Sequence, residues 1–305
     1  MNNDKNLNGH LFALLANIMW GLMSPIGKQA LQEFSPISVT TFRMVGAALA
    51  FWLLSLFCKQ EHVNHRDMLK IAFASLFALV FNQGIFIFGL SLTSPIDASI
   101  VTTTLPIVTM IVAAIYLKEP ITNKKVLGIF VGAMGALILI LSSQSAGNGN
   151  GNLLGDLLCL VAQISFSIYL TVFKGLSQQY SVVTINKWMF VYASICYIPL
   201  SSTDIMAIQW DAVSVTATLQ LLYVVFGGSF VAYLCIMTAQ KLLRPTVVSM
   251  YNYMQPIVAT IAAIIMGIGS FGWQKGLAIA LVFLGVYIVT QSKSKADFEK
   301  MGKKL

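Results

Sequence analysis

The sequence has few charged residues for its length. Only 10% of its 305 residues are Asp, Glu, Lys or Arg, whereas 57% are apolar, and the mean hydropathy is +0.79. A soluble domain carries about 25% charged residues. This scarcity of charge excludes an ordinary soluble protein and indicates a polytopic membrane protein.

Long polar stretches are also missing. The uncharged runs are long enough to cross ~30 Å of hydrocarbon at ~1.5 Å per residue, and they predict ten transmembrane helices. The runs lie near residues 10–31, 37–58, 68–91, 96–117, 124–143, 153–173, 182–202, 215–240, 246–267 and 273–291. The connections between them are too short to hold a soluble domain. We therefore expect an all-α protein whose function lies within the helical bundle.

The motifs of several kinds of chemistry are absent as well. The chain has four cysteines without CxxC spacing, which are typical of packing residues rather than disulfides or metal ligands. It has no Walker-type phosphate loop, no paired catalytic carboxylates and no nucleophile placed beside a base. The sequence therefore predicts no metal, no cofactor and no enzymatic activity. A membrane-embedded enzyme and a non-transporting sensor are the less favoured alternatives.

Acidic residues are scarcer than basic ones, with 11 Asp and Glu against 19 Lys and Arg. The excess does not indicate nucleic-acid binding, because most of the basic residues fall in alternate loops and in the tail that begins at Lys293. Only Lys28 and Lys275 fall on the other side. The positive-inside rule then predicts cytoplasmic termini for a multi-pass protein of the cell (inner) membrane. The expected partners are a small-molecule substrate and the lipid bilayer, with a homo-oligomer left open.

An internal repeat is the strongest pattern that is present. With a shift of 150 residues, Pro95 aligns with Pro245 and Pro106 with Pro256; with a shift of 146, Asn17 aligns with Gln163. The sequence thus predicts two five-helix repeats, 1–145 and 146–305. Because five is odd, the second repeat enters the membrane from the opposite face. Inverted repeats around a central cavity are typical of transporters.

The two aligned prolines are expected at the middle of the membrane. Pro106 lies about ten residues from one end of its helix and Pro256 about ten from the opposite end, which is ~15 Å in each case. Each proline should kink its helix and free the carbonyl four residues earlier, that of Thr102 or Asn252. Such backbone is tolerated in a membrane only where it is buried or lines a cavity.

Polar residues around these prolines are the candidate substrate site. Ser249, Asn252 and Gln255 share one arc of the ninth helix, flanked by Tyr251 and Tyr253. The alternative is a kinked helix whose polar groups only bond neighbouring helices. Further deep polar and aromatic candidates, each open to the same alternative, are Asn17, Trp20, Asn82, Gln83, Thr102, Gln163, Phe166 and Tyr233.

Two charged residues fall inside expected spans. Arg43 on the second helix and Asp97 on the fourth are both expected near the outer surface, and charged groups within a membrane are functional candidates. Three roles are compatible with this position: an Arg43–Asp97 ion pair that closes the outer mouth, binding of a substrate carboxylate by Arg43, or snorkelling of both side chains to the interface without a function. The sequence leaves these three alternatives open.

Three stretches of the sequence resemble those of a known transporter family. The stretches "NIMWG" (17–21), "SPISVTTFRMVGAALA" (35–50) and "DASIVTTTLPIVTMIVAAIYLKEPITNKKVLGIFVGAMGALIL" (97–139) resemble the ten-helix EamA-type members of the drug/metabolite transporter superfamily. The resemblance implies a helical bundle around a central cavity and movement of small metabolites across the cell membrane. It also implies a cavity role for Trp20, Arg43, Pro106 and Pro256. The chain departs from the family pattern at Gly269, where many members repeat the glutamate seen here as Glu119.

These observations favour a secondary transporter, acting as an exporter. No carboxylate is expected at the midplane, where a proton-coupled carrier of cationic drugs needs one. We therefore expect a neutral, zwitterionic or anionic metabolite, with amino acids and their relatives as the leading class. The alternative is a drug efflux carrier. Glu119 is expected at a solvated helix end in a cytoplasmic turn.

Overall fold

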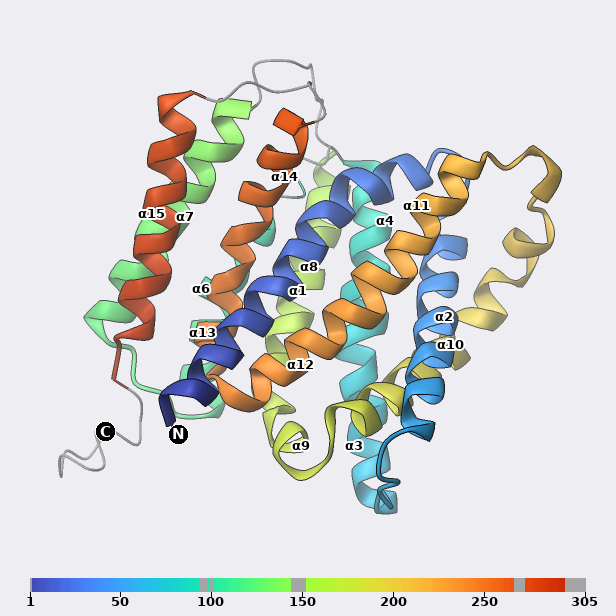
Figure 1. Ribbon diagram of the computed structural model, residues 1–305, viewed down its shortest axis with the longest axis horizontal. Coiled ribbons are helices and arrows are strands. Elements are labelled where there is room, and N and C mark those ends of the chain that lie inside the picture. The colour runs from blue at the N-terminus through green and yellow to red at the C-terminus, as the bar shows by residue number, and fades with distance from the viewer. Residues whose placement is uncertain (1, 94–97, 99–100, 144–151, 266–271, 294–305) are drawn as a thin grey trace.

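The computed structural model describes residues 2–93, 98, 101–143, 152–265 and 272–293, and all of its elements are helical (Figure 1). The first repeat contains α1 (Asn2–Ala30), α2 (Pro36–Leu56), α3 (His65–Ser75), η1 (Leu76–Gly84), α4 (Ile85–Leu92), α6 (Leu105–Tyr116) and α7 (Asn123–Ser143). The second contains α8 (Leu153–Val172), α9 (Lys174–Gln179), α10 (Val182–Met206), η3 (Trp210–Ala212), α11 (Val215–Val225), η4 (Phe226–Val231), α12 (Ala232–Leu242), α13 (Pro245–Met250), η5 (Tyr251–Tyr253), α14 (Met254–Ile265) and α15 (Trp273–Thr290). In the described part of the chain these elements form the ten successive helical runs that the sequence predicts.

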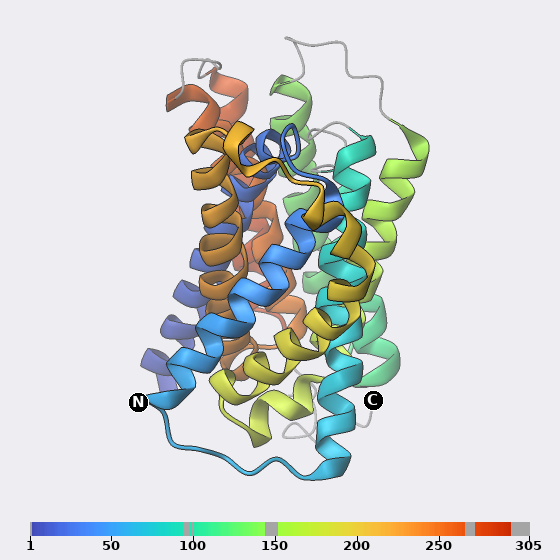
Figure 2. The same cartoon turned by 90° about the vertical axis from the view of Figure 1, so that its right-hand side faces the viewer.

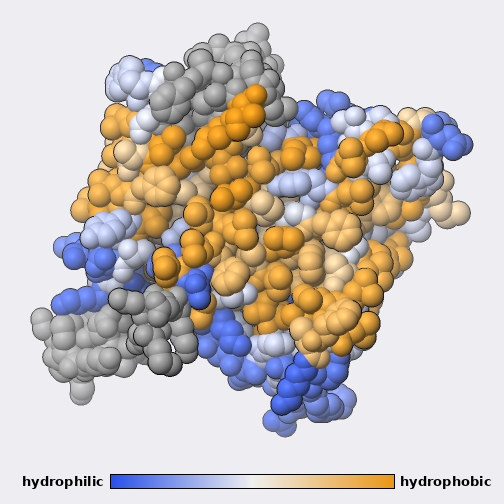
Figure 3. Space-filling view, in the orientation of Figure 1, coloured by the Kyte–Doolittle hydropathy of each residue, from blue (hydrophilic) through white to orange (hydrophobic). Residues whose placement is uncertain are grey.

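The outer surface of the bundle is apolar. Large side chains such as Leu53, Ile195 and Leu200 are exposed, and Figure 3 shows hydrophobic residues covering the middle of one face between hydrophilic ends. Six helical segments are long and apolar enough to cross a membrane, and Leu105–Tyr116 and Gly276–Thr290 are shorter apolar helices. Because apolar side chains gain nothing from facing water, this surface is that of a multi-pass membrane protein.

The two repeats interlock through matching contacts. α7 packs most extensively on its counterpart α15, and α2 packs on its counterpart α10. In the same way α1 packs on α12 and α14, while α8 packs on α4 and α6. Figure 1 shows α1 rising from the lower end, where the chain begins, whereas α8 descends toward α9 at that end. Counterpart helices therefore run in opposite directions, as an inverted repeat requires.

Small residues allow a close contact between the backbones of α7 and α15. A Cβ atom added to Gly285 would lie 2.6 Å from the carbonyl oxygen of Gly128, and one added to Gly128 would lie 2.8 Å from that of Gly285. Backbones approach this closely in membranes only where side chains are absent. Figure 1 shows that α15 ends at the end of the bundle where α1 begins, and Figure 2 shows the connection between α2 and α3 at that same end.

Local sequence signals explain where several helices begin. Ser35, Ser181 and Ser214 precede α2, α10 and α11, and the side chain of each accepts a hydrogen bond from a backbone N–H in the first turn. Serine is among the best N-cap residues because it satisfies one of the free N–H groups. Pro36 follows Ser35 in the first turn of α2, where its missing N–H has no effect.

Four of the long helical runs are interrupted near the middle of the bundle. The third is π-helical over η1 and the eighth over η4, and these segments begin at counterpart residues, Leu76 and Phe226. The ninth narrows to a 3₁₀ turn at η5, which ends three residues before Pro256. The fourth forms a turn at 103–104, directly before α6 and Pro106. Each repeat thus contains two interruptions, at counterpart helices.

Candidate functional site

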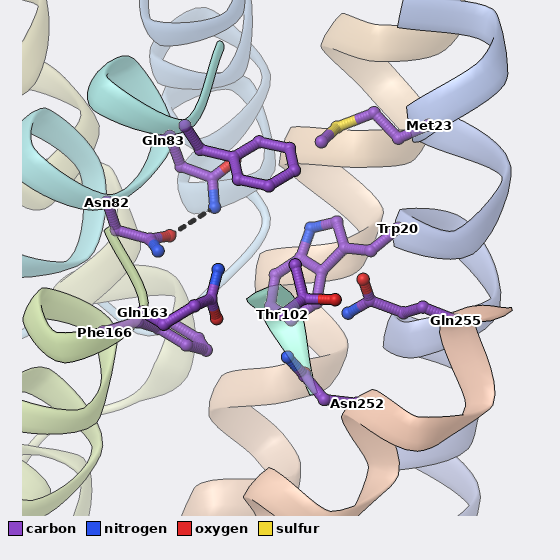
Figure 4. A pocket seen from close by; sticks show the side chains of 10 residues that line it. Trp20, Met23, Asn82, Gln83, Thr102, Gln163, Phe166, Asn252 and Gln255 are labelled. Carbon is purple, nitrogen blue, oxygen red and sulfur yellow. Dashed lines mark hydrogen bonds between the residues drawn. The ribbon is translucent and has the colours of Figure 1, made fainter. Parts of the chain in front are cut away.

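Residues of three of the four interrupted runs, the third, the fourth and the ninth, line a central cavity. Only about 40 Å³ is available there to the centres of water molecules, which is room for a few waters at ~10–15 Å³ each. The lining residues are Trp20, Met23, Asn82, Gln83, Phe86, Thr102, Gln163, Phe166, Asn252 and Gln255 (Figure 4). Most of them are residues that the sequence analysis singled out, and the structure gathers them from both repeats.

Two walls of the cavity face each other. In Figure 4, Asn82, Gln83 and Gln163 lie on one side, and Trp20 and Gln255 lie on the other. The first wall belongs to η1 and α8, whereas the second belongs to α1 and α14. Each wall therefore combines helices of both repeats, so a relative movement of the repeats must change the shape of the cavity.

An aromatic pair joins the two walls. The rings of Trp20 and Phe166 meet edge to face, with centroids 5.6 Å apart and an interplanar angle of 82°. The two residues occupy counterpart positions at a shift of 146, so they meet where the two repeats cross. Edge-to-face aromatic pairs contribute ~0.5–1.5 kcal/mol of stabilisation beyond that from burial of the rings. The pair gives the cavity a stiff apolar surface beside its amides.

A chain of hydrogen bonds runs along the η1 wall. The Nη2 atom of Arg43 donates to Oε1 of Gln83. The Nε2 atom of Gln83 donates to Oδ1 of Asn82 over 2.6 Å, and Nδ2 of Asn82 donates to the carbonyl of Ala162 over 2.9 Å. The chain links α2, η1 and α8, and therefore holds two cavity amides in place.

The backbone of η1 is secured by hydroxyl groups from three other helices. Ser165 on α8 donates to the carbonyl of Phe77 over 2.8 Å. Tyr233 on α12 donates to the carbonyl of Ala78 over 2.6 Å, and Tyr197 on α10 donates to that of Val80 over 2.9 Å. Irregular backbone is stable in a membrane only when its polar groups find such partners, and π-helical segments are frequent at functional sites.

Side chains from α1 and α2 hold the η4 segment by hydrogen bonds. Nε1 of Trp20 donates to the carbonyl of Gly228 over 2.9 Å. The Ser229 hydroxyl donates to the carbonyl of Val224 over 3.1 Å and accepts a 2.9 Å hydrogen bond from Nε of Arg43. Trp20 thus has two roles: its ring lines the cavity, and its N–H secures η4.

Arg43 lies deeper than its expected place near the outer surface. Its side chain is fully buried between η1 and η4, and its Nη1 atom has no hydrogen-bond partner among the described residues. Asp97 lies outside the described residues, so the expected ion pair stays a prediction. The position of Arg43 follows from its two partners, Gln83 and Ser229, which both lie on interrupted helices.

Four of the expected site residues lie outside the cavity lining. Asn17 is buried behind Gln255, from whose Nε2 it accepts a 3.0 Å hydrogen bond. Tyr233 holds η1, as described above. The Ser249 hydroxyl donates within its own helix to Thr246, and the Tyr253 hydroxyl donates to Ile129 on α7 over 3.3 Å. These hydroxyls bond to the protein, and a direct contact with substrate stays a prediction for all four residues.

Two apolar lining residues, Met23 and Phe86, are not among the residues expected from the sequence. Each lies three residues after a residue that the sequence analysis did select, Trp20 and Gln83, and residues three apart share a helix face. Both are apolar residues within apolar runs, and residue type alone does not distinguish such residues from lipid-facing side chains. Helical spacing from the selected residues is the signal that could have found them.

The expectation of a solvated Glu119 is wrong. Its side chain is only 10% exposed and lies 2.7 Å from Nζ of Lys125, which is 2% exposed. The hydroxyl of Thr246 on α13 lies 3.3 Å from the same carboxylate oxygen. The turn after α6 folds back against α7 and α13, which buries the pair. Gly269, the counterpart of Glu119, lies outside the described residues.

The arrangement is suited to binding a polar solute. The lining offers carboxamides, one hydroxyl and aromatic faces, and none of the ten lining residues is charged. Among the described residues, no group of three or more His, Cys, Asp or Glu gathers to hold a metal ion. The lining supplies hydrogen-bond donors and acceptors but no nucleophile paired with a base.

Comparison with known proteins agrees with this architecture. The profile of the EamA-like transporter family matches residues 7–141 and again residues 153–291. The chain belongs to this family. Its two matches cover one five-helix repeat each, in agreement with the repeat seen in the sequence and in the helix packing. The chain is therefore a polytopic membrane transporter by family, with an all-helical duplicated fold.

Three relatives illustrate the similarity. An uncharacterized transporter of Archaeoglobus fulgidus is 24% identical over 90% of this chain and 95% of that protein. The uncharacterized transporter YyaM of Bacillus subtilis is 24% identical over 92% and 93%. A WAT1-related protein of Arabidopsis thaliana is 23% identical over 91% and 82%. A solved crystal structure with 15% identity matches at a TM-score of 0.74, covering 94% of this chain and 96% of the other, which shows the shared fold.

Proposed function

We propose that the chain is a secondary transporter that exports small neutral, zwitterionic or anionic metabolites across the cell membrane, with amino acids and their relatives as the leading class. The observation that carries this proposal is the cavity between the two inverted repeats. Its walls offer five carboxamides and an aromatic pair. Such groups recognise a polar solute by hydrogen bonds and apolar contact, and a site without carboxylates is poorly suited to cationic drugs.

Alternating access is the mechanism that the geometry supports. The cavity is too small for a metabolite unless the surrounding helices move apart. Each wall contains one interrupted helix beside a continuous one, and the weakened backbone hydrogen bonding of an interrupted helix lets its two halves bend separately. Rocking one repeat against the other would open the cavity to one face of the membrane at a time.

The test is transport by the purified full-length protein in sealed liposomes. Liposomes loaded with radiolabelled amino acids, simple carboxylic acids or simple amines are diluted, and the loss of label is compared with that from protein-free liposomes. We expect faster efflux, and counterflow, of at least one amino acid or carboxylic acid. The proposal fails if no compound moves faster than in the protein-free control, or if only amines do.

We also propose that both termini face the cytoplasm. His62, between α2 and α3, and Asp211, in η3, are exposed at opposite ends of the bundle. Single cysteines at these positions, in a variant without the native cysteines, report the orientation in intact cells. A membrane-impermeant thiol reagent should label Asp211→Cys and spare His62→Cys. The reverse pattern would overturn the orientation and the reading of the lysine asymmetry.

A further inference from the structure

The amide groups of the η1 wall have only one orientation available. The Arg43 guanidinium is exclusively a donor, so Gln83 must turn its oxygen toward it. Nε2 of Gln83 then faces Oδ1 of Asn82, and Nδ2 of Asn82 faces the carbonyl of Ala162, which is exclusively an acceptor. The chain begins at a pure donor and ends at a pure acceptor. Flipping either amide would set donor against donor or acceptor against acceptor, and would break both of its bonds.

This orientation makes the η1 wall a donor surface. An amide nitrogen carries two hydrogens, and the chain uses one from Gln83 and one from Asn82. The second hydrogen of Gln83 is taken by the Tyr233 hydroxyl oxygen, whereas that of Asn82 has no acceptor among the described residues, and both side chains line the cavity. Figure 4 shows the Gln83 nitrogen directed at the Asn82 oxygen, at the edge of the cavity. One oriented N–H group, that of Asn82, is therefore available to a solute on this side.

The facing wall has the opposite polarity for the same reason. Nδ2 of Asn17 donates to the carbonyl of Ala13 over 2.8 Å, so its Oδ1 is turned toward Gln255. Gln255 donates to that oxygen through Nε2. Its own Oε1 is then left without a donor among the described residues. Gln163 and Asn252 also line the cavity but make no hydrogen bond to described residues, so they can adapt to either polarity.

We propose that the cavity binds its solute in one orientation. A hydrogen-bond-accepting end, a carboxylate or carbonyl, lies on Asn82, and a donating end, an ammonium or amide N–H, lies on Gln255. Arg43 is the positioning residue: it fixes the polarity of the wall through Gln83 without contacting the solute. Its positive charge behind the wall also favours a carboxylate there. This inference rests on the proposed function, since it assumes that the central cavity is the transport site.

The test is binding of matched probes to the purified full chain in lipid nanodiscs. Each of three series contains an amino acid, the acid that lacks its amine and the amine that lacks its carboxylate. The series are alanine with propionate and ethylamine, leucine with 4-methylpentanoate and isopentylamine, and phenylalanine with 3-phenylpropionate and phenethylamine. We expect the amino acid to bind best and the amine to bind at least tenfold more weakly than the acid, in one series or more. Equal binding of acid and amine, or no binding in any series, overturns the proposal.

Variants of Gln83 and Arg43 test the role of the chain. Gln83→Glu accepts from Arg43 as the amide does, but its carboxylate has no N–H to donate to Asn82, which must then turn its own nitrogen toward the carboxylate and its oxygen away. We expect it to invert the preference, so that the amine binds better than the acid. Arg43→Gln removes the positive charge and the donor at one end of the chain, while the Ala162 carbonyl still orients the other end, so it should lower the acid-to-amine ratio toward one without inverting it. Gln163→Leu is the matched control, because it removes a lining carboxamide outside the chain; it should weaken all probes and leave the ratio near that of the wild type.

A merely structural role for Arg43 gives a different result. It would lower the melting temperature and weaken every probe by the same factor, with the ratio unchanged in both Arg43→Gln and Gln83→Glu. That outcome overturns the inference even if Arg43→Gln is poorly folded, because Gln83→Glu keeps the arginine. The transport assay separates the two proposals. Efflux by the wild type with an unchanged ratio in Gln83→Glu rejects the polarity alone, whereas no efflux of any compound rejects the transport function.

Discussion

The segments η1 and η4 hold the same place in the two repeats and use it differently. Both interrupt a long helix with π-helical backbone, and they begin at counterpart residues. η1 ends in Asn82, Gln83 and Gly84, which place two amides at the cavity. η4 contains Gly227, Gly228 and Ser229 instead, and it contributes a carbonyl to Trp20 and a hydroxyl to Arg43.

The difference indicates how a duplicated fold becomes a specific site. The irregular backbone is present in both halves, so it belongs to the architecture that the repeats share. The polar side chains differ, so recognition lies on one half and its support on the other. Arg43 connects the two, since it donates to Gln83 on η1 and to Ser229 on η4.

Alanine at one glycine of each segment, Gly84 in η1 or Gly227 in η4, should show the largest difference. A Cβ at Gly84 would lie 1.5 Å from the Tyr197 hydroxyl, whereas one at Gly227 would lie 3.0 Å from the ring of Tyr223. Gly84→Ala displaces Tyr197 from Val80 and overpacks the site, each of which costs ~1–3 kcal/mol. Gly227→Ala should be near neutral, because a small ring shift is offset by a helix-propensity gain of ~1 kcal/mol. The melting temperatures of both variants, measured in the same detergent, give the comparison. Similar losses of stability in the two variants would contradict the difference between η1 and η4.

Leucine at Asn252 tests whether the ninth helix takes part in recognition. The leucine removes a carboxamide from the cavity, and a solute group left unpaired should cost ~1–3 kcal/mol, which is a roughly 5- to 150-fold loss of affinity. Gln255→Leu should behave alike. Ser249→Ala is the control, since that hydroxyl bonds within its own helix. Normal affinity with a lower melting temperature in Asn252→Leu would mean that this arc is structural.

Removal of a tyrosine hydroxyl should have a smaller effect. Tyr233→Phe deletes the hydrogen bond to Ala78 on η1, and Tyr223→Phe deletes one of 2.9 Å to Met19 on α1. Hydrogen bonds between helices in bilayers contribute ~0.6 kcal/mol on average and ~1.7 at most. Tyr233→Phe should lie near the upper value because Tyr233 is fully buried, whereas Tyr223 is half-buried. Unfolding free energies of both variants give the comparison, and a larger loss in Tyr223→Phe would reverse it.

The smallest effect is expected at the start of α11, the helix that leads into η4. Hydrogen bonds from the Ser214 backbone N–H (2.9 Å) and hydroxyl (2.7 Å) lower the pKa of Glu33, because they stabilise its carboxylate. The unfolded carboxyl has the higher pKa, about 4.3. The bonds therefore stabilise the fold above that pH, and this contribution is lost as the pH falls through the folded value.

Glu33→Gln should accordingly melt slightly below the wild type at pH 7 and converge with it near pH 3. Glu33 is exposed, so solvent screening keeps the difference small. Melting temperatures measured between pH 7 and pH 3 follow the convergence. A constant difference across that range would mean that the charge of Glu33 does not contribute to the cap.

Much of the fold follows from local sequence. The uncharged runs predict the helical crossings, and the self-alignment at Pro106 and Pro256 predicts the repeat and its inversion. The π-helical segments were not predicted, because Leu76–Gly84 and Phe226–Val231 contain no proline and show the hydrophobicity of any spanning helix. Their existence depends on hydroxyls from helices far away in the sequence, such as Tyr197 and Tyr233.

For this protein the sequence by itself determined the environment, the duplicated topology and the polar residues that could not face lipid. Helix length, hydropathy and the positions of prolines are local properties of the chain, and they determine its placement in the membrane without reference to distant residues. Only the tertiary structure decided which of those residues face a common cavity, that Arg43 lies between η1 and η4, and which way the amides of Gln83 and Gln255 point. Those properties are relations between helices, because the orientation of an amide is set by the donor or acceptor that packing brings to it.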